Sequence, residues 1–240
     1  MTFAPFSGSL SENALADYFY LIDRGYPEKG SLKLIGDKYK LDTVQRTILY
    51  RGVCSHQKSL SREQKLTSEI QDPLIVDGYN VLFTLLNYRL GRFVFLATDS
   101  ICRDAGSLFG KIRKEKLFSE CATLFANAIK QSGSPRSIIY FDSPVSFSGQ
   151  HRSFMEDLLS SLNIDHEVKI VHSADSAIKE HNSGTVATSD SALIDVCHIP
   201  VIDLPRRIIE ENYKTRLFSL KDMLHEILNA KGSFLEKKEK

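Results

Sequence analysis

The spacing of apolar residues changes near residue 71. Before this point apolar side chains recur every three or four residues, as they do on one face of an amphipathic helix. After it, short β-branched or aromatic runs alternate with helical stretches. This change predicts a small all-helical module over residues 1–70, an α/β domain over residues 71–235 and a charged tail over residues 236–240.

The helical module is expected to contain four helices. They are residues Ser11–Gly25, a second helix that begins near Pro27, residues Thr43–Arg51 with Asp42 as N-cap, and residues Ser61–Ile70. The assignment rests on the apolar spacing together with these start and stop signals, since Asp is a favoured N-cap and proline is favoured in the first turn.

The α/β domain is expected to alternate strands and helices. The predicted strands are Leu74–Asp77, Arg92–Ala97, Ser137–Phe141, Glu167–Val171, Thr185–Thr188 and Pro200–Asp203. The predicted helices are Asn80–Tyr88, Leu117–Gln131, Gln150–Leu162, Ala174–His181, Asp190–Val196 and Ser219–Ala230. Alternation of this kind implies right-handed βαβ crossovers, and therefore a three-layer domain with a mostly parallel central sheet.

Composition adds few constraints. Hydrophobic residues make up 42% and charged residues 25% of the chain, and the net charge of +1 gives no sign of a nucleic-acid partner. The four cysteines contain no C-x-x-C pair, which argues against a structural zinc site or a disulfide framework. The N-terminal residues lack a basic region followed by an apolar core, so we expect no secretory signal, and no apolar run approaches the ~18 residues that span a bilayer. We expect a cytoplasmic protein without membrane contact, and a homodimer is compatible with these features.

A carboxylate follows strand after strand of the predicted sheet. These acids are Asp77, Asp99, Asp142, Asp175 and Asp190. The carboxyl ends of parallel strands meet at one edge of a sheet, where open α/β sheets bind ligands. We therefore expect up to five carboxylates to converge there.

Such a cluster has a chemical consequence. Two carboxylates ~4 Å apart repel by roughly 4 kcal/mol at an effective dielectric of 20, so a cluster is costly unless it binds a cation or holds protons. Oxygen ligands without cysteine or clustered histidine favour Mg²⁺ or Mn²⁺ over zinc. Hydrolysis of a phosphodiester is the natural chemistry of such a site.

Each acid also has a purely structural explanation. Asp77 precedes a glycine and is typical of a turn, and Asp142 could start a turn before Ser-Pro. Asp175 and Asp190 both open helical stretches, where Asp is a favoured N-cap. The recurrence of acids at successive strand ends favours the site over four separate structural roles.

Basic and hydroxyl side chains are the candidates for substrate contact. A cluster in the helical module comprises Arg46, Arg51, His56, Lys58, Arg62 and Lys65, against the single acid Glu63. With Lys111, Arg113, Lys114 and Lys116 it could contact the phosphates of a substrate, or it could be a solvated helix face. The hydroxyl-rich stretch after Asp142 adds Ser143, Ser146 and Ser148, which could hold a phosphate or form an ordinary loop. His151 just beyond it is a further candidate phosphate contact.

The sequence resembles the PIN-like nucleases, especially their NYN branch, over residues 73–203. The resemblance rests on Asp77-Gly78-Tyr79-Asn80 and Thr188-Ser189-Asp190, with Phe141-Asp142 and Ala174-Asp175 between them. It implies a Mg²⁺- or Mn²⁺-dependent ribonuclease with Asp77, Asn80, Asp142, Asp175 and Asp190 as the catalytic set. Asp77, Asp142 and Asp190 would ligate the metal, and Asp175 would hold the metal or its water. Asn80 would arrange the site, and Thr188 or Ser189 would orient a ligand or water.

The whole chain also resembles an uncharacterised prokaryotic family built from two domains of unknown function, of which the first is helical. Residues Arg92–Lys116 depart from the PIN-like pattern because they are inserted where a helix is expected. This segment holds Asp99, Arg103 and Asp104 as second candidates for the site, although the two acids could simply pair with Arg103.

Two other functions stay open at this point. One is a non-catalytic RNA- or protein-binding protein on the same scaffold, which the inserted segment favours. The other is a Mg²⁺-dependent phosphohydrolase of a small phosphorylated substrate, although the first strand lacks the Asp-x-Asp of the common phosphatase type. A P-loop and a G-x-S-x-G motif are both missing from the sequence.

Overall fold

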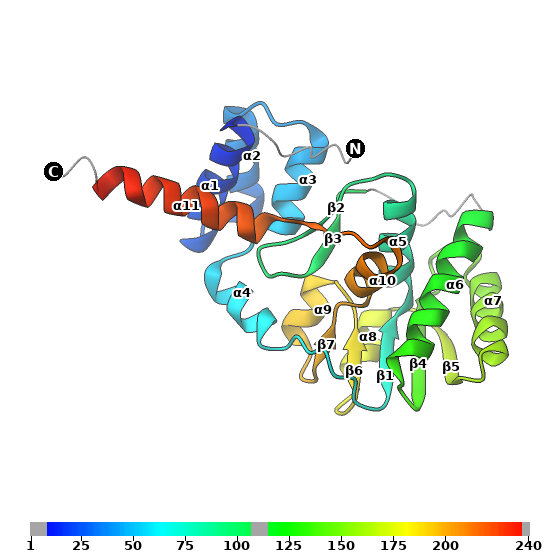
Figure 1. Cartoon of the computed structure of the whole chain (residues 1–240). Coiled ribbons are helices and arrows are strands. Elements are labelled where there is room, and N and C mark those ends of the chain that lie inside the picture. Colours follow the sequence, from blue (N-terminus) through cyan, green and yellow to red (C-terminus); the bar gives the residue numbers. More distant parts are fainter. Residues whose placement is uncertain (1–8, 107–114, 237–240) are drawn as a thin grey trace. The chain divides into compact units, whose positions relative to one another are not determined.

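The chain folds into two compact units that are interleaved along the sequence. The computed structural model describes residues 9–106 and 115–236 (Figure 1). Unit 1 comprises residues 1–63, 92–106 and 217–240, and unit 2 comprises residues 64–91 and 107–216. Unit 1 is thus assembled from three separate stretches of chain, in contrast to the consecutive division that the apolar spacing predicts.

Unit 2 is built on a five-stranded parallel sheet. The strands are β1 (Leu74–Asp77), β4 (Arg136–Asp142), β5 (Asp165–Val171), β6 (Thr185–Ala187) and β7 (Val201–Ile202). Their order is β5-β4-β1-β6-β7, and every neighbouring pair is parallel. All residues of β1 are buried, as expected for a central strand covered on both faces.

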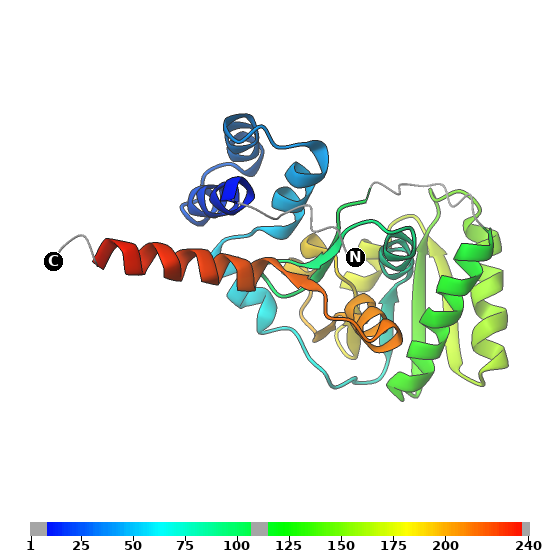
Figure 2. The same ribbon diagram turned by 45° about the horizontal axis from the view of Figure 1, so that its top comes forward.

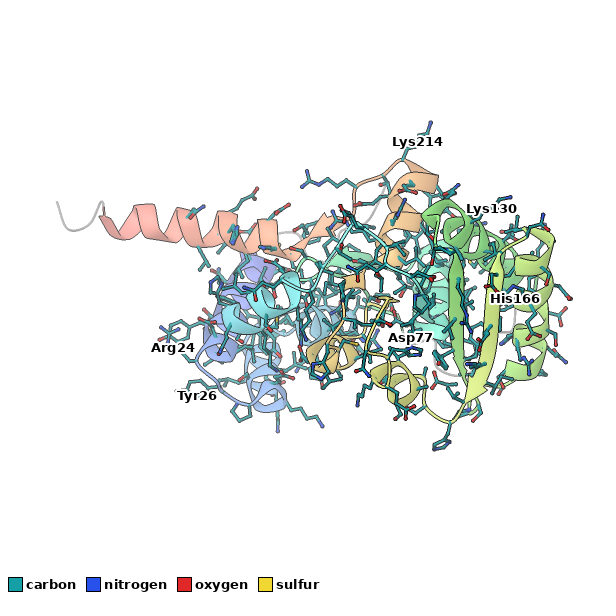
Figure 3. The ribbon with its side chains drawn as sticks, turned by 90° about the horizontal axis from the view of Figure 1, so that it is seen from below. Arg24, Tyr26, Asp77, Lys130, His166 and Lys214 are labelled. Atoms are coloured by element: carbon teal, nitrogen blue, oxygen red, sulfur yellow. The ribbon has the colours of Figure 1, made fainter. Side chains whose placement is uncertain are left out.

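Helices flank this sheet. They are α5 (Gly78–Arg89), α6 (Glu115–Ser132), α7 (Ser148–Ser161), α8 (Ala174–Lys179), α9 (Ser191–Val196) and α10 (Leu204–Tyr213). Helices α5, α6 and α7 pack side by side with α10 against the first two, whereas α8 packs on β1, β4 and α9. Lys130 of α6 and Lys214 at the end of α10 lie on the same side of Asp77 (Figure 3). The prediction of an α/β fold with a parallel central sheet and helices in layers around it is confirmed.

The direction of the chain reverses at β1. From this central strand the chain continues to β4 and β5 on one side, and then crosses back to β6 and β7 on the other. Such a reversal opens a crevice outside the carboxyl ends of the strands, because the two connecting segments leave in opposite directions. Asp77, the last residue of β1, stands at that point.

Unit 1 combines helices from both ends of the chain with a small sheet. Its helices are α1 (Ser9–Asp23), α2 (Glu28–Lys38), α3 (Thr43–Gly52), α4 (His56–Glu63) and α11 (Leu220–Glu236), and its strands are β2 (Val94–Leu96), β3 (Cys102–Asp104) and β8 (Phe218–Ser219). Helix α11, drawn in red, runs beside the blue α1 (Figure 2). Leu15, Ile48, Phe95 and Leu220 meet in one buried apolar cluster.

Two predicted elements are corrected. The strand expected at residues 92–97 forms as β2, but it pairs with β3 and β8 instead of joining the parallel sheet, because Phe95 is buried in the core of unit 1. The helix expected at residues 61–70 is wrong. Helix α4 ends at Glu63, and the Thr67 backbone N–H then donates to the Val201 carbonyl of β7 at 2.9 Å.

Three elements were missed by the apolar spacing. Strands β3 and β8 are too short to show alternation, and α10 follows β7 after a single residue, Asp203, which caps it by accepting from the Arg206 N–H at 3.1 Å. Among the described residues, no helix combines the length and apolar character needed to cross a membrane.

Candidate active site

Asp77 lies at the centre of the carboxyl edge of the sheet. Its side chain caps α5 by accepting from the Asn80 backbone N–H at 3.3 Å, and its other oxygen accepts from the Thr188 hydroxyl at 3.1 Å. The residue is only 5% exposed. The chain can turn tightly into α5 because the next residue is Gly78, where a Cβ would come within 2.4 Å of the Phe141 ring.

Two acids flank Asp77 on the neighbouring strands. Asp142 ends β4, and its Oδ1 accepts from the Ala174 N–H at the start of α8 at 2.8 Å. Asp190 lies three residues beyond β6 and caps α9 by accepting from the Ala192 and Leu193 N–H groups at 2.7 and 3.1 Å. Because β4 and β6 both pair with β1, these acids share one edge of the sheet with Asp77.

The fourth acid, Asp175, is supplied by helix α8, which packs on β1 and β4. It lies in the first turn of α8, whose N-cap is Ser173 rather than Asp175. Asp175 is half-buried, and in the described part of the chain no hydrogen bond is made by its carboxylate. The carboxylates of the other three acids each accept from a backbone N–H group.

The four carboxylates act on one another electrostatically. The pKa of Asp77 is raised to about 7, chiefly by burial and then by the charges of Asp175 and Asp142, against the hydrogen bonds from Asn80 and Thr188. Burial also raises the pKa of Asp175, as do the charges of Asp190 and Asp142, with only Lys179 acting in the opposite direction. The acids are therefore close neighbours whose repulsion is largely uncompensated by basic side chains.

The donor atoms of this edge suit a hard divalent cation. All are carboxylate oxygens, and the excess of negative charge would be relieved by a bound cation. Within the described residues, however, no three of His, Cys, Asp or Glu stand close enough to form a ready-made metal cage. Mg²⁺ commonly takes one or two carboxylates and fills its remaining positions with water and phosphate oxygens, so the residues fit that mode of binding.

A hydrogen-bond network ties Asn80 to the turn after β6. The Asn80 side-chain oxygen accepts from the Ser189 N–H at 2.7 Å and from the Ser189 hydroxyl at 2.8 Å. Thr188 donates to Asp77 and accepts from the Asp190 N–H at 3.1 Å. Thr188 and Ser189, which the sequence suggested as substrate contacts, are buried and hold the acids in place.

The hydroxyl-rich loop follows Asp142 directly at the same edge. The side chains of Ser143 and Ser146 are exposed and that of Ser148 is half-buried. The Ser143 N–H donates to the Val171 carbonyl at 2.7 Å, which ties the loop to the end of β5. Helix α7 then begins without a side-chain cap. The serines therefore lie on the loop that leaves the end of β4 beside Asp142, and their contact with a substrate stays a prediction.

The second candidates lie elsewhere. Asp99 is not at the edge of the parallel sheet but in the turn between β2 and β3 of unit 1, because β2 belongs to the smaller sheet. Its buried carboxylate pairs with Arg62 at 2.9 Å and with Arg103 at 3.2 Å. Asp104 pairs with Arg51 rather than with Arg103. Asp99, Arg103 and Asp104 are therefore structural in this arrangement.

Most of the basic side chains that the sequence offered for phosphate contact have partners within the fold. Arg46 pairs with Asp37, Arg51 with Asp104, Lys58 with Glu28 and Arg62 with Asp99, and Lys65 donates to the carbonyls of Ile194 and Asp195 at the end of α9. The Arg62–Asp99 pair is buried, whereas the Lys58–Glu28 pair is exposed and contributes little to stability. Lys111, Arg113 and Lys114 lie outside the described residues, and Lys116 is exposed in the first turn of α6.

A buried aromatic pair beside the acids was not foreseen. The His151 Nδ1 and the Tyr79 hydroxyl are hydrogen-bonded at 2.9 Å, and the His151 ring lies 4.2 Å from that of Phe118. Burial lowers the pKa of His151, so the ring is neutral and is not the exposed phosphate contact that the sequence suggested. Burial raises the pKa of Tyr79, and the charge of Asp142 adds to this effect.

Comparison with known proteins identifies the family. The model of the family described as "Domain of unknown function (DUF5616)" matches residues 67–207, more than half of the chain. The chain belongs to this family. A second family, "Protein of unknown function (DUF434)", matches residues 11–65. The "Uncharacterized protein MJ0935" of Methanocaldococcus jannaschii is 30% identical over 204 residues, which cover 83% of this chain and 96% of that protein. No solved structure matches.

The DUF5616 match contains the whole acidic edge. Its window runs from the turn before β1 to the start of α10 and includes all four acids with Asn80, Thr188 and Ser189. The DUF434 match ends before β1 and covers the helices that open unit 1. Neither description names an activity, so the chemistry has to be argued from the side chains.

Proposed function

We propose that this protein is a metal-dependent ribonuclease that hydrolyses RNA phosphodiester bonds at the site formed by Asp77, Asp142, Asp175 and Asp190. One observation carries the proposal. The pKa of the buried Asp77, at the reversal point of the sheet, is raised first by burial and then by the charges of Asp175 and Asp142, and its carboxylate is held by the neutral donors Asn80 and Thr188 rather than by a basic side chain. A fold tolerates such repulsion most readily where a cation is meant to bind.

The residues present suit Mg²⁺ or Mn²⁺ held by Asp77, Asp142 and Asp190 in some combination of one or two direct ligands with water. When bound, the ion supplies Lewis-acid activation of water and offsets the negative charge of the phosphate. Asn80 and Thr188 fix the carboxylate of Asp77 through their hydrogen bonds. Asp175 accepts a hydrogen bond from the attacking water, because its oxygens are not engaged by the described residues.

The resemblance to PIN-like nucleases supports RNA as the substrate, and the exposed serines beside Asp142 supply donors for phosphate and ribose oxygens. The paired basic residues of unit 1 do not add to this support. The preference for RNA therefore rests on the resemblance and on the loop after β4.

Asp175→Asn is the sharpest test of the activity. The substitution removes a charge from the cluster and breaks no hydrogen bond among the described residues, so the variant is expected to fold at least as stably as wild type. Mn²⁺-dependent cleavage of labelled RNA should fall by at least about 100-fold. Asp165→Asn is the matched control, because Asp165 is an exposed acid at the opposite edge of the sheet, and its cleavage should equal wild type.

Equal cleavage by Asp175→Asn and wild type would contradict the assignment. Phosphate release from small phosphoesters without RNA cleavage would point to a phosphohydrolase instead. A second function is favoured by a different observation: Asp77, Asp142 and Asp190 each accept from backbone N–H groups at helix starts. A protein that only binds RNA could use the acids in this way, and it would bind RNA without cutting it whether or not metal is present.

A further inference from the structure

Phe147, in the loop beside the acidic edge, has two energetically unfavourable features. It lies five residues beyond Asp142, and 62% of its surface is open to solvent. Its backbone has φ +67, in the left-handed region that residues other than glycine rarely adopt. An apolar ring loses contacts by remaining in water, and a side chain in this backbone region adds strain. Phe147 therefore combines an exposed apolar ring with a strained backbone.

The loop holds this ring in a defined place. The Val145 N–H donates to the carbonyl of Asp142, and the Ser148 N–H donates to the carbonyl of Val145. The Phe147 carbonyl accepts from the His151 N–H at 3.0 Å, and His151 is itself buried against Tyr79. The backbone of Phe147 is therefore fixed between the end of β4 and the first turn of α7, which is anchored by the buried His151.

The surroundings of the ring suit a nucleobase better than a protein. Within the described part of unit 2, the other exposed large apolar side chain is Val196, so Phe147 does not belong to an apolar patch of the kind that protein interfaces need. The exposed residues before it in the loop are Ser143, Pro144 and Ser146, so two hydroxyls lie on the same loop as the ring. An exposed flat ring on one loop with these hydroxyls matches a base with its ribose and phosphate.

We propose that Phe147 is a stacking platform that holds a nucleobase of single-stranded RNA next to the scissile phosphate. The inference rests on the proposed nuclease function for its substrate, but it concerns binding and is separable from cleavage. Stacking on an aromatic ring tolerates any base, so the platform would strengthen binding without reading the sequence.

Phe147→Gly tests the platform because glycine removes the ring and also relieves the backbone. The probe is a labelled single-stranded oligoadenylate, with the full chain in EDTA so that binding is measured without cleavage. The variant should bind roughly 5- to 150-fold more weakly, the range expected for the loss of one base–aromatic stack. Its melting temperature should equal or exceed that of wild type, since a left-handed residue has been replaced by glycine. Phe147→Tyr should restore binding.

Asn163→Gly is the matched control. Asn163 also has a left-handed backbone, with φ +55, but it lies between α7 and β5 at the opposite edge of the sheet. Its affinity for oligoadenylate should equal that of wild type. An oligonucleotide that carries abasic sites should bind wild type and Phe147→Gly alike.

Equal binding of oligoadenylate by Phe147→Gly and wild type would overturn the platform, as would an equal loss of affinity on the abasic probe or no binding by wild type. The two proposals fail in different ways. Weaker binding by Phe147→Gly without cleavage by any variant would support the platform and reject the nuclease. Cleavage that depends on Asp175, with binding indifferent to Phe147, would support the nuclease and reject the platform.

Discussion

The side-chain oxygen of Asn80 accepts two hydrogen bonds from Ser189, one from its backbone N–H and one from its hydroxyl. This contact joins the first turn of α5 to the turn after β6, two segments that are more than a hundred residues apart in sequence. Since Asp77 precedes α5 and Asp190 follows Ser189, the same contact fixes the spacing of two acids. Asn80 can therefore order the site without touching a substrate.

Asn80→Ala should destabilise the protein by about 1–3 kcal/mol, because it leaves two buried donors of Ser189 without an acceptor. Ser189→Ala should cost less, about 1 kcal/mol, since its backbone N–H still reaches Asn80. Urea unfolding of both variants measures the difference. A larger loss in Ser189→Ala than in Asn80→Ala would show that Asn80 does not hold this turn.

The raised pKa of Asp77 predicts a pH dependence of stability in the absence of divalent cations. Between the ordinary pKa of 3.8 and the folded value of about 7, the folded protein keeps a proton that the unfolded chain has released. The free energy of unfolding should therefore fall as pH rises through this window and level off above it. The free energy of unfolding of Asp77→Asn should vary less with pH than that of wild type. Above pH 7 it should exceed the wild-type value by on the order of 4 kcal/mol at most.

Unfolding free energies of wild type and Asp77→Asn, measured in EDTA across this window, test the prediction. Their difference reports the titration of Asp77 together with its coupling to Asp175 and Asp142. A constant difference between the two proteins would mean that the pKa of Asp77 is the same in the folded and unfolded states.

Asp99→Asn should lower the stability of the protein by about 3–5 kcal/mol, because it removes the buried carboxylate that two guanidinium groups contact. Glu211→Gln is the control. It breaks an exposed ion pair with Arg207 on α10 and should cost less than about 1 kcal/mol. Denaturant unfolding measures both. If both variants lost similarly little stability, the ion pairs of Asp99 with Arg62 and Arg103 would not contribute substantially to the stability of unit 1.

Gly78→Ala should destabilise the protein by about 1–3 kcal/mol through overpacking, since its Cβ would approach the buried Phe141 ring to 2.4 Å and the Ile139 side chain to 2.9 Å. Gly30→Ala in α2 meets nothing within 4 Å and should be neutral or stabilising by up to about 1 kcal/mol, since alanine favours helix. Thermal unfolding distinguishes them. Comparable melting temperatures of the two variants would mean that the turn after β1 can accommodate a Cβ at residue 78.

The elements of unit 2 were largely predictable because short apolar runs and amphipathic stretches report burial directly. The runs at Leu74–Asp77 and Ser137–Phe141 are buried strands in the structure, and the acids that follow them meet at one edge. Asp99 shows the limit of this reasoning. It also follows a strand, but strand partners are set by long-range packing, and the local sequence around Phe95 does not show that β2 pairs with β8.

The environments of charged and aromatic side chains were harder to predict from the sequence than the positions of the strands. Arg46, Arg51 and Arg62 form a basic cluster in sequence, whereas their acidic partners are brought to them only by the fold. His151 was mistaken for a surface residue because its neighbours in sequence are polar. Its burial depends on Tyr79 and Phe118, which come from other helices.

The interleaving of the two units bears on how the protein is made. Helices α1 to α3 are synthesised before the parallel sheet, yet the apolar cluster that buries them also contains Phe95 and two residues that follow the sheet, Leu220 and Leu224. The last strand of the parallel sheet, β7, is synthesised before either of these two leucines. During translation the sheet that bears the acids can therefore be completed while helices α1 to α3 still lack part of their core. These helices precede the sheet in sequence but can complete their packing only after it.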